Sequence, residues 1–372
     1  MMRKLPDFPW DRLAPAKARA GQHADGIVDL SVGTPVDPVP ELIQAALREA
    51  ADAPGYPLTY GTPALREAAA GWMARRHGVA ADASAVLPVL GTKELVAWLP
   101  MLLGLGAGDK VAIPAIAYPT YDVGARLAGA DTMLTSGEGG AADLIRAERP
   151  RMLWLNSPGN PHGRVAPVAE LRAAVEAARD VGTVLVSDEC YIELGWSEDG
   201  ETDLKPVSIL HPDVCGDSHE GLLVLHSLSK RSNLAGYRAG FVAGDRALVL
   251  ELLEIRKHAG MIMPGPVQHA MTVAFSDDVH ADEQKERYRA RRTMLRRALE
   301  SAEFRVDYSD AGLYLWVTRD EPCWETVGWL AELGILAAPG DFYGVSGASH
   351  VRVALTATDE RVAAAVSRLT AS

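Results

Sequence analysis

The middle of the chain alternates short apolar runs with longer amphipathic stretches. Short apolar runs predict strands, and apolar residues that recur every three or four positions predict helices. The predicted strands cover Val86–Leu90, Lys110–Ile113, Met152–Leu155, Thr183–Ser187, Leu222–His226 and Ala239–Val242. The predicted helices cover Lys93–Leu103, Tyr121–Ala128 and Val168–Arg179. Strands that alternate with helices favour an α/β fold with a mostly parallel sheet, covered by helices on both faces.

The pattern changes past residue 280, where a long charged helix is predicted over Asp282–Ala302. Three further strands and two helices follow it: Phe304–Asp307, Leu313–Val317, His350–Leu355, Cys323–Leu333 and Val362–Leu369. We expect a large domain over residues 41–265. A smaller α/β domain would comprise residues 1–40 and 266–372, with the Pro- and Gly-rich N-terminal segment packed on it. A cleft between two domains is the natural place for a site.

The charge of the chain narrows the classes of partner. Its 372 residues carry a net charge of -12, with 48% hydrophobic and 23% charged residues, as in an ordinary soluble globular protein. A phosphate backbone or an anionic bilayer repels such a chain, so neither nucleic acid nor membrane is expected as a partner. The longest apolar stretch, Leu95–Leu105, is interrupted by Pro100 and is too short to span a membrane. No signal peptide is evident at the N-terminus, and a cytoplasmic location is expected.

The cysteines are few and scattered. Cys190, Cys215 and Cys323 are odd in number and form no CxxC pair. This argues against a disulfide framework and against a zinc site, and it fits a reducing compartment. We therefore expect no metal site.

The segment Leu222–Gly240, LLVLHSLSKRSNLAGYRAG, carries the most suggestive lysine. A predicted strand runs into Ser227, Ser229 and Lys230, and Arg238 follows a glycine-containing turn. Desolvation and a neighbouring cation both lower the pKa of a lysine, as a nucleophilic amine requires. The two serines and Arg238 are suited to hold a phosphate group. The alternative is a surface lysine at the end of a strand.

Three weaker motifs also follow predicted strands. In VLVSDECY, Asp188 ends a strand and Tyr191 lies just beyond it; the carboxylate is suited to pair with a protonated ring nitrogen, although an Asp that caps a turn is the alternative. In NSPGNPHG, the Asn160-Pro161 bond is a candidate cis bond, or part of a plain turn. In LGTKE, the backbone N–H groups of Gly91, Thr92 and Lys93 would face an anion at a helix N-terminus.

Together and in this order, the four motifs resemble the fold-type I enzymes that use pyridoxal 5′-phosphate (PLP), and among them the class I/II aminotransferases. The resemblance extends from SVGTP at Ser31 to HVRVAL at His350. It implies the aspartate aminotransferase-like fold, with a large domain built on a seven-stranded, mostly parallel sheet and a small α/β domain. It also implies a homodimer with shared active sites.

The resemblance assigns roles to matching residues. Lys230 would bond covalently to the cofactor and move the proton, and Asp188 would bind the ring nitrogen. Tyr191 and Asn160 would donate to the ring oxygen. The phosphate would be bound by Ser227, Ser229, Arg238, Gly91, Thr92 and Lys93.

Four further roles follow from the same resemblance. Tyr118, in AYPTY, would stack on the cofactor ring. Arg352 would take the substrate carboxylate, with Asn160 and Gly33 lining the same pocket. Tyr56 would reach the phosphate in the partner subunit. Without the resemblance, Arg352 reads as an exposed strand arginine and Tyr118 as a core residue.

A closer resemblance narrows the substrate. The stretches LPDFPWDRLAPAKARA, DGIVDLSVGTPVDPVP, SDECYIELGW, SLSKRSNLAGYRAGFVAGD and APGDFYG are similar to the N-succinyldiaminopimelate aminotransferases of high-GC bacteria. This implies amino transfer between glutamate and N-succinyl-2-amino-6-oxopimelate, in lysine and diaminopimelate synthesis. One departure is Ser157-Pro158, where the family often has Asn-Pro.

Other functions are also considered. The nearest alternatives are an aminotransferase for LL-diaminopimelate, aspartate, alanine or aromatic amino acids, and a PLP-dependent lyase on the same fold. A transcriptional regulator with an aminotransferase-like domain would carry an added basic DNA-binding domain, which this acidic chain does not suggest. An α/β protein without PLP would need all four motifs to arise by accident.

Overall fold

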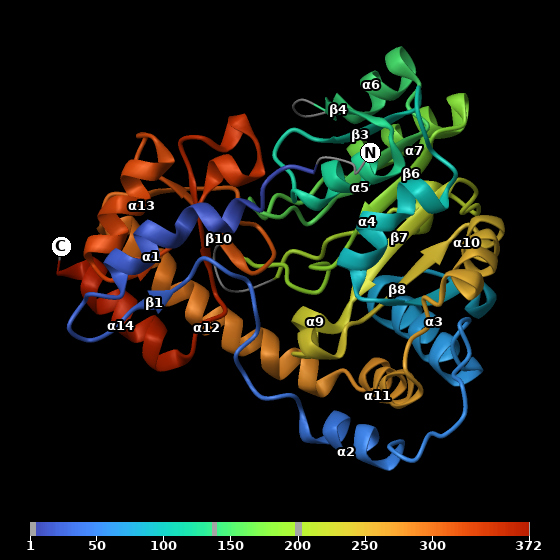
Figure 1. The fold of residues 1–372 in the computed structure, drawn as a ribbon, viewed down its shortest axis with the longest axis horizontal. Coiled ribbons are helices and arrows are strands. Elements are labelled where there is room, and N and C mark those ends of the chain that lie inside the picture. The colour runs from blue at the N-terminus through green and yellow to red at the C-terminus, as the bar shows by residue number, and fades with distance from the viewer. Residues whose placement is uncertain (1–4, 136–139, 198–202, 372) are drawn as a thin grey trace.

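Seven strands form a mostly parallel sheet at the centre of the larger part of the molecule (Figure 1). The computed structural model describes residues 5–135, 140–197 and 203–371. In spatial order the strands are β2 (Val86–Leu90), β8 (Ala239–Gly244), β7 (Leu222–Ser227), β6 (Val184–Asp188), β5 (Met152–Asn156), β3 (Lys110–Pro114) and β4 (Asp131–Thr135). Strand β8 runs antiparallel to both its neighbours, β2 and β7, and the other strand pairs of this sheet are parallel. The predicted seven-stranded, mostly parallel sheet is therefore confirmed.

Helices cover both faces of this sheet, as the alternating pattern predicts. One face packs against α3 (Pro63–His77), α6 (Gly140–Glu148), α7 (Val168–Val181) and α11 (Gly265–Ser276). The other packs against α4 (Thr92–Leu102), α5 (Thr120–Ala128) and α10 (Arg246–Ala259). Because both faces are covered, a central strand such as β7 is buried along its whole length. This explains why the sequence of β7 shows a continuous apolar run rather than an alternation.

A second, antiparallel sheet lies in the C-terminal part, in the order β12 (Ala338–Pro339), β13 (Val351–Ala354), β10 (Tyr314–Thr318) and β9 (Arg305–Asp307). The surrounding helices are α1 (Ala14–Ala20), α12 (Val279–Ser301), α13 (Cys323–Glu332) and α14 (Asp359–Thr370). Strand β1 (Val28–Asp29) pairs in parallel with β11 (Ile335–Leu336). The N-terminal segment thus packs on the C-terminal part, as expected.

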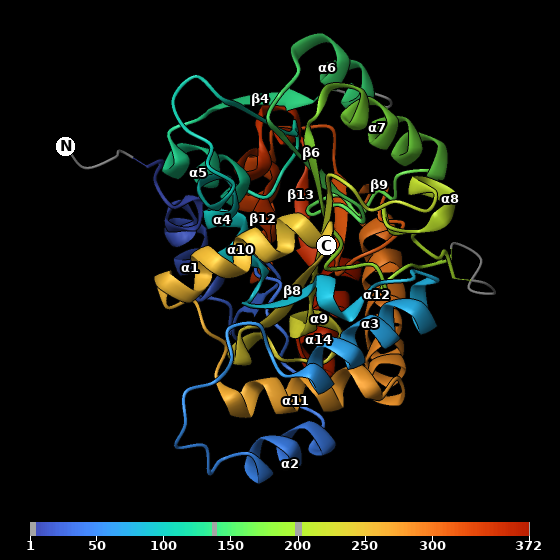
Figure 2. The same ribbon diagram turned by 90° about the vertical axis from the view of Figure 1, so that its right-hand side faces the viewer.

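The limits of the two domains stay a prediction. Helix α11 follows the predicted boundary after residue 265, yet it packs on α3 and on α2 (Glu41–Glu49), as Figure 2 shows at the lower end of the molecule. Its buried residues belong to the core of the large sheet. This packing favours a boundary closer to the start of α12.

Some elements differ from the prediction. The strands common to both agree within two residues, but β4 was not predicted because it is a partly exposed edge strand with a polar sequence. Helix α14 begins three residues earlier than predicted, at Asp359. Its first turn is acidic and follows the cap Thr358, and such residues stabilise a helix N-terminus without adding to the apolar pattern. Within the described residues, no helix is long and apolar enough to cross a membrane.

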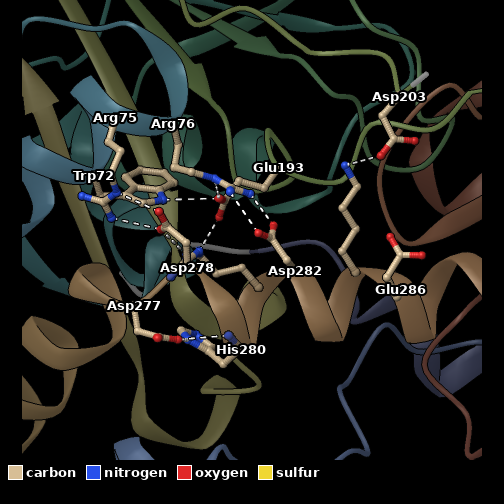
Figure 3. A network of polar contacts seen from close by, with 12 residues as sticks. Trp72, Arg75, Arg76, Glu193, Asp203, Asp277, Asp278, His280, Asp282 and Glu286 are labelled. Carbon is tan, nitrogen blue, oxygen red and sulfur yellow. Dashed lines mark hydrogen bonds and ion pairs between the residues drawn. The ribbon is translucent and has the colours of Figure 1, made fainter. Parts of the chain in front are cut away.

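A buried ionic network includes Arg231, the last residue of α9 (Leu228–Arg231), the short helix that follows β7. Figure 3 shows Glu193 in this network with Arg76 and Trp72. The Nε of Arg231 donates to the carboxylate of Glu193, which also accepts from Arg76 Nε at 3.0 Å and from Trp72 Nε1 at 3.4 Å. Arg231 donates further to the carbonyl of Ala274 at 2.9 Å. The network therefore ties the lysine-bearing helix to α3, to α11 and to the turn after β6.

Glu193→Gln should lower the free energy of unfolding at pH 7 by about 3 kcal/mol, because it leaves the buried Arg231 guanidinium with only the longer ion pair to Asp278, at 3.7 Å. Burial raises the pKa of Glu193, but Arg231, His77 and Arg76 outweigh it, so the pKa lies below its usual value. A carboxyl group with a lowered pKa in the folded state stabilises the protein above its unfolded pKa, and this stabilisation is lost as the pH falls through the folded pKa. Denaturant unfolding at several pH values measures both effects.

The difference between wild type and Glu193→Gln should therefore shrink as the pH falls below about 4. Glu283→Gln, at an exposed position on α12, is the matched control and should change stability little. Equal effects of the two substitutions at pH 7 would contradict the role given to the Glu193 pair.

Candidate active site

A cavity of about 520 Å³ opens where β5, β6 and β7 end, and β10 and β13 contribute to its wall. Parallel strands bind ligands at this edge because their carboxyl ends meet there. The structure brings most of the predicted site residues to this cavity. They are Gly33, Thr92, Lys93, Tyr118, Asn160, Asp188, Tyr191, Ser227, Ser229, Lys230, Arg238 and Arg352. Gly91 lies directly against Arg238, whereas Tyr56 is fully exposed elsewhere on the surface.

Lys230 projects from the one-turn helix α9 into the cavity. The Ser227 hydroxyl begins this helix by accepting from the Ser229 N–H at 3.1 Å. The Nζ of Lys230 donates to the carbonyl of Gly33, in the segment that follows β1. Burial lowers the pKa of Lys230, so the neutral, nucleophilic form of the amine is more populated than in an exposed lysine. The surface-lysine alternative is therefore wrong.

Three hydrogen bonds, accepted by successive backbone carbonyls, hold the segment Ser31–Gly33 against Lys230 and the C-terminal part. Ser31 accepts from Arg352 at 2.7 Å, Val32 accepts from the Thr356 hydroxyl at 3.0 Å, and Gly33 accepts from Lys230. The segment is thus fixed from both sides of the cavity.

Asp188 is the last residue of β6 and is buried. Its Oδ2 accepts from the Tyr121 hydroxyl at 2.9 Å, and its Oδ1 accepts from the Cys190 N–H at 3.2 Å. Burial raises the pKa of Asp188 against the effect of these hydrogen bonds. Such a fixed carboxylate in a site of low polarity is suited to pair with a protonated ring nitrogen. Tyr121 was not predicted as a site residue, although it stands in the same AYPTY motif as Tyr118.

The turn after β5 is organised by Asn156, which the sequence analysis did not single out. Its side-chain amide donates to the carbonyls of Asp188 and Pro158, and its oxygen accepts from the Asn160 N–H at 2.8 Å. Asn160-Pro161 is cis, as predicted, and Ser157-Pro158 is cis as well. The hydroxyl of Ser157, at the position where the family often has asparagine, accepts from the Ala166 N–H at 3.0 Å.

The part of the cavity formed by the start of α4, Arg238 and two serines is suited to an anion. Helix α4 begins at Thr92, and N–H groups in the first turn of a helix lack partners within the helix. Gly91, with φ +80°, lies so close to Arg238 that a Cβ atom there would be 2.2 Å from the guanidinium. Ser227 and Ser229 line the same cavity. The helix start, a guanidinium and two hydroxyls together fit a phosphate group.

Arg352 is buried in β13 and faces the cavity. It donates to Asn160 Oδ1 at 2.9 Å as well as to the Ser31 carbonyl. Its Nε has no hydrogen-bond partner among the described residues. Burial lowers the pKa of Arg352, but the surrounding tyrosines outweigh this effect, so the guanidinium stays charged. A buried cation held in this way is suited to bind a carboxylate.

Tyr118 lies beside the cation of Lys93, whose Nζ is 5.9 Å from the centre of the Tyr118 ring. The rings of Tyr118 and Tyr121 are in edge-to-face contact, with their centres 6.1 Å apart.

Several cavity residues were not predicted. They are Phe8, Trp10, Val32, Thr34, Val96, Tyr121, Asn156, Cys190, Ala235 and Tyr314. Phe8 and Trp10 come from the N-terminal segment, where no periodic pattern indicates a contact with residues so distant in the chain.

Residues 25–369 match the family described as aminotransferase class I and II, and the chain belongs to this family. A probable aminotransferase of Mycobacterium tuberculosis is 62% identical over 367 residues, which cover 98% of this chain and 85% of that protein. The 4-dedimethylamino-4-oxo-anhydrotetracycline transaminase OxyQ of Streptomyces rimosus is 59% identical, over 99% of this chain and 100% of that protein. An aminotransferase structure from Neisseria meningitidis has a TM-score of 0.86 and 29% identity, covering 99% and 97% of the two chains.

The protein is therefore a PLP-dependent aminotransferase with the aspartate aminotransferase-like fold. The residues present fit the cofactor. A buried lysine, a buried carboxylate and an anion site line one cavity, and the close approach of Arg238 to Gly91 leaves no room for a side chain at the anion site.

Gly91→Ala should weaken PLP binding at least about tenfold, because the new Cβ atom would displace the Arg238 guanidinium. Gly104→Ala is the matched control, since Gly104 has a similar φ of +73° but nothing within 4 Å of its Cβ position. PLP dissociation is followed by the absorbance of the bound cofactor. Equal affinity in the two variants would show that the contact between Gly91 and Arg238 is unimportant.

Proposed function

We propose that the chain moves an amino group between glutamate and N-succinyl-2-amino-6-oxopimelate, the reaction that yields N-succinyl-LL-diaminopimelate. The observation that carries the site assignment is that Lys230, Asp188 and Arg352 line one buried cavity. When bound, PLP withdraws electrons from the substrate α-carbon and stores the amino group between the two halves of the reaction.

Each residue then has a defined task. Lys230 would take a proton from the substrate α-carbon and deliver it to the cofactor carbon bonded to the amino nitrogen, and its buried amine is suited to both steps. Asp188 keeps a proton on the cofactor ring nitrogen. Tyr191 and Asn160 donate to the ring oxygen, Tyr118 stacks on the ring, and Arg352 orients the substrate through its α-carboxylate.

The choice of substrate is supported by the sequence resemblance and by the charge at the cavity. The proposed substrate carries carboxylates distant from the reacting carbon. Lys93 also lines the cavity, with its Nζ 5.7 Å from the centre of the Phe8 ring, and supplies a positive charge besides Arg352 for such a group.

A second candidate is amination of a ketone on a polycyclic ring, since the relative OxyQ is a 4-dedimethylamino-4-oxo-anhydrotetracycline transaminase. The 59% identity to OxyQ and the aromatic side chains of Phe8, Trp10 and Tyr118 at the cavity favour it. A flat ring system would contact these side chains, whereas an open-chain acid would rely on the cations.

We also propose a homodimer with shared active sites, in which Tyr56 reaches the partner's phosphate site. The assignment rests on the family resemblance, and the complete exposure of Tyr56 in the single chain leaves its side chain free for such a contact. Size measurement in solution tests the assembly.

Lys230→Ala should abolish turnover and the covalent attachment of PLP, which is detected by borohydride reduction followed by mass determination. An active, reducible Lys230→Ala protein would refute the lysine assignment.

Arg352→Ala should retain PLP but lose at least about a hundredfold in kcat/KM, because a charge-assisted, bidentate carboxylate contact is removed. Unchanged kinetics in Arg352→Ala would place the carboxylate elsewhere.

The substrate is tested by a half-reaction screen in which the cofactor spectrum is followed after adding single amino donors. N-succinyl-LL-diaminopimelate should react faster than LL-diaminopimelate, aspartate, alanine or aromatic amino acids. The oxo-anhydrotetracycline is offered as amino acceptor to the aminated enzyme. Faster reaction with the polycyclic ketone than with the succinylated keto acid would favour the second candidate.

A further inference from the structure

Tyr314 is a buried cavity residue to which neither the sequence motifs nor the proposed reaction gives a task. It begins β10 in the C-terminal sheet, where β10 pairs with β13, the strand that carries Arg352. Only 4% of Tyr314 is exposed, and it lines the same cavity as Lys230. The residue therefore reaches the cofactor side of the cavity from the C-terminal part.

The hydroxyl of Tyr314 contacts the cofactor-binding side of the site. It lies 3.1 Å from the hydroxyl of Tyr191, so the two phenols share a hydrogen bond. It also lies against Gly33, where a Cβ atom would be 2.0 Å from the Tyr314 oxygen. Gly33 thus leaves space for this hydroxyl while its own carbonyl accepts from Lys230.

The ring of Tyr314 contacts the carboxylate-binding side of the site. The guanidinium carbon of Arg352 lies 3.9 Å from the centre of the ring, well within the range of a cation–π contact. Tyr343 also faces Arg352, but at 5.1 Å, and its hydroxyl has no hydrogen-bond partner among the described residues. Tyr314 is therefore the closer of the two rings, and its hydroxyl bonds to a site residue.

We propose that Tyr314 is a positioning residue that links the two halves of the site: its hydroxyl orients Tyr191 toward the cofactor ring oxygen, and its ring holds Arg352 in place for the substrate carboxylate. This inference depends on PLP binding at the site and not on which amino acid is the substrate.

The direction of the shared hydrogen bond follows from the task of Tyr191. A Tyr191 hydroxyl that donates its single proton to the cofactor can only accept from Tyr314. Burial raises the pKa of Tyr314, but Arg352 and Lys230 outweigh it, so the pKa lies below its ordinary value. A more acidic phenol is a better donor, and a donor to Tyr191 strengthens the bond that Tyr191 makes in turn.

Two substitutions separate the hydroxyl from the ring. Tyr314→Phe removes only the hydroxyl and should shift the pH titration of the bound cofactor's absorbance in the same direction as Tyr191→Phe, by a smaller amount. It should lower kcat about three- to tenfold, as expected for the loss of one neutral hydrogen bond. It should change the binding of a carboxylic acid without an amino group very little, because the ring beside Arg352 is kept. Tyr314→Leu should weaken that carboxylate's binding about tenfold, because the cation–π contact is lost.

Tyr343→Phe is the matched control, because it removes a hydroxyl from the other ring beside Arg352. It should leave the cofactor titration unchanged. In the double variant Tyr191→Phe/Tyr314→Phe, the second substitution should add almost nothing to the first, since the hydroxyl of Tyr314 acts through Tyr191.

An unchanged titration in Tyr314→Phe, or additive effects in the double variant, would overturn the proposal. Unchanged carboxylate binding in Tyr314→Leu would overturn the role of the ring. If Tyr314→Leu does not fold, the phenylalanine variants still decide the role of the hydroxyl, on which the proposal then stands or falls. The titration needs no substrate, so failure of the proposed substrate leaves this result intact.

Discussion

The site depends on keeping the amine of Lys230 buried and correctly aimed, although α9, the helix that carries it, is a single turn. Such a short helix cannot hold a side chain by its own hydrogen bonds. The surrounding structure supplies the support: the Ser227 cap at the start of the helix, the Glu193 and Arg231 pair at its end, and the Gly33 carbonyl that accepts from the lysine. Residues far apart in the chain must therefore be in place before the lysine is.

The three successive carbonyls of Ser31–Gly33 make the two parts of the molecule interdependent. Arg352 and Thr356 belong to the C-terminal part and Lys230 to the large sheet, yet all three donate to this one segment. A shift of either part would break hydrogen bonds to buried carbonyls, which is costly. Arg352, which we propose binds the substrate carboxylate, and Lys230 are thus kept in register by the backbone of Ser31–Gly33, whose side chains carry no charge.

Much of the fold followed from the sequence because the pattern of strand and helix is local. The predicted strands of the large sheet were found, since each is a continuous apolar run. Most site residues were also predicted, because motifs place them at strand ends where a parallel sheet gathers ligands. Tyr121, Asn156 and Tyr314 were not, because their side-chain contacts with distant residues form only after folding. Nothing in the sequence alone distinguishes Tyr314 from the other core residues of its strand.

The reversal of the single strand β8 governs how the phosphate site can be assembled. Its first residue, Ala239, pairs with Leu90 at the end of β2, and its second, Gly240, pairs with Ser227 at the end of β7. Arg238 therefore enters the sheet between the Gly91 turn and the Ser227 cap. Had β8 run parallel to the rest, a crossover helix would have carried the chain back to the opposite edge. Lys230 and Arg238, the arginine proposed to bind the phosphate, thus belong to one short connection between β7 and β8, so a change in its length would displace one group relative to the other.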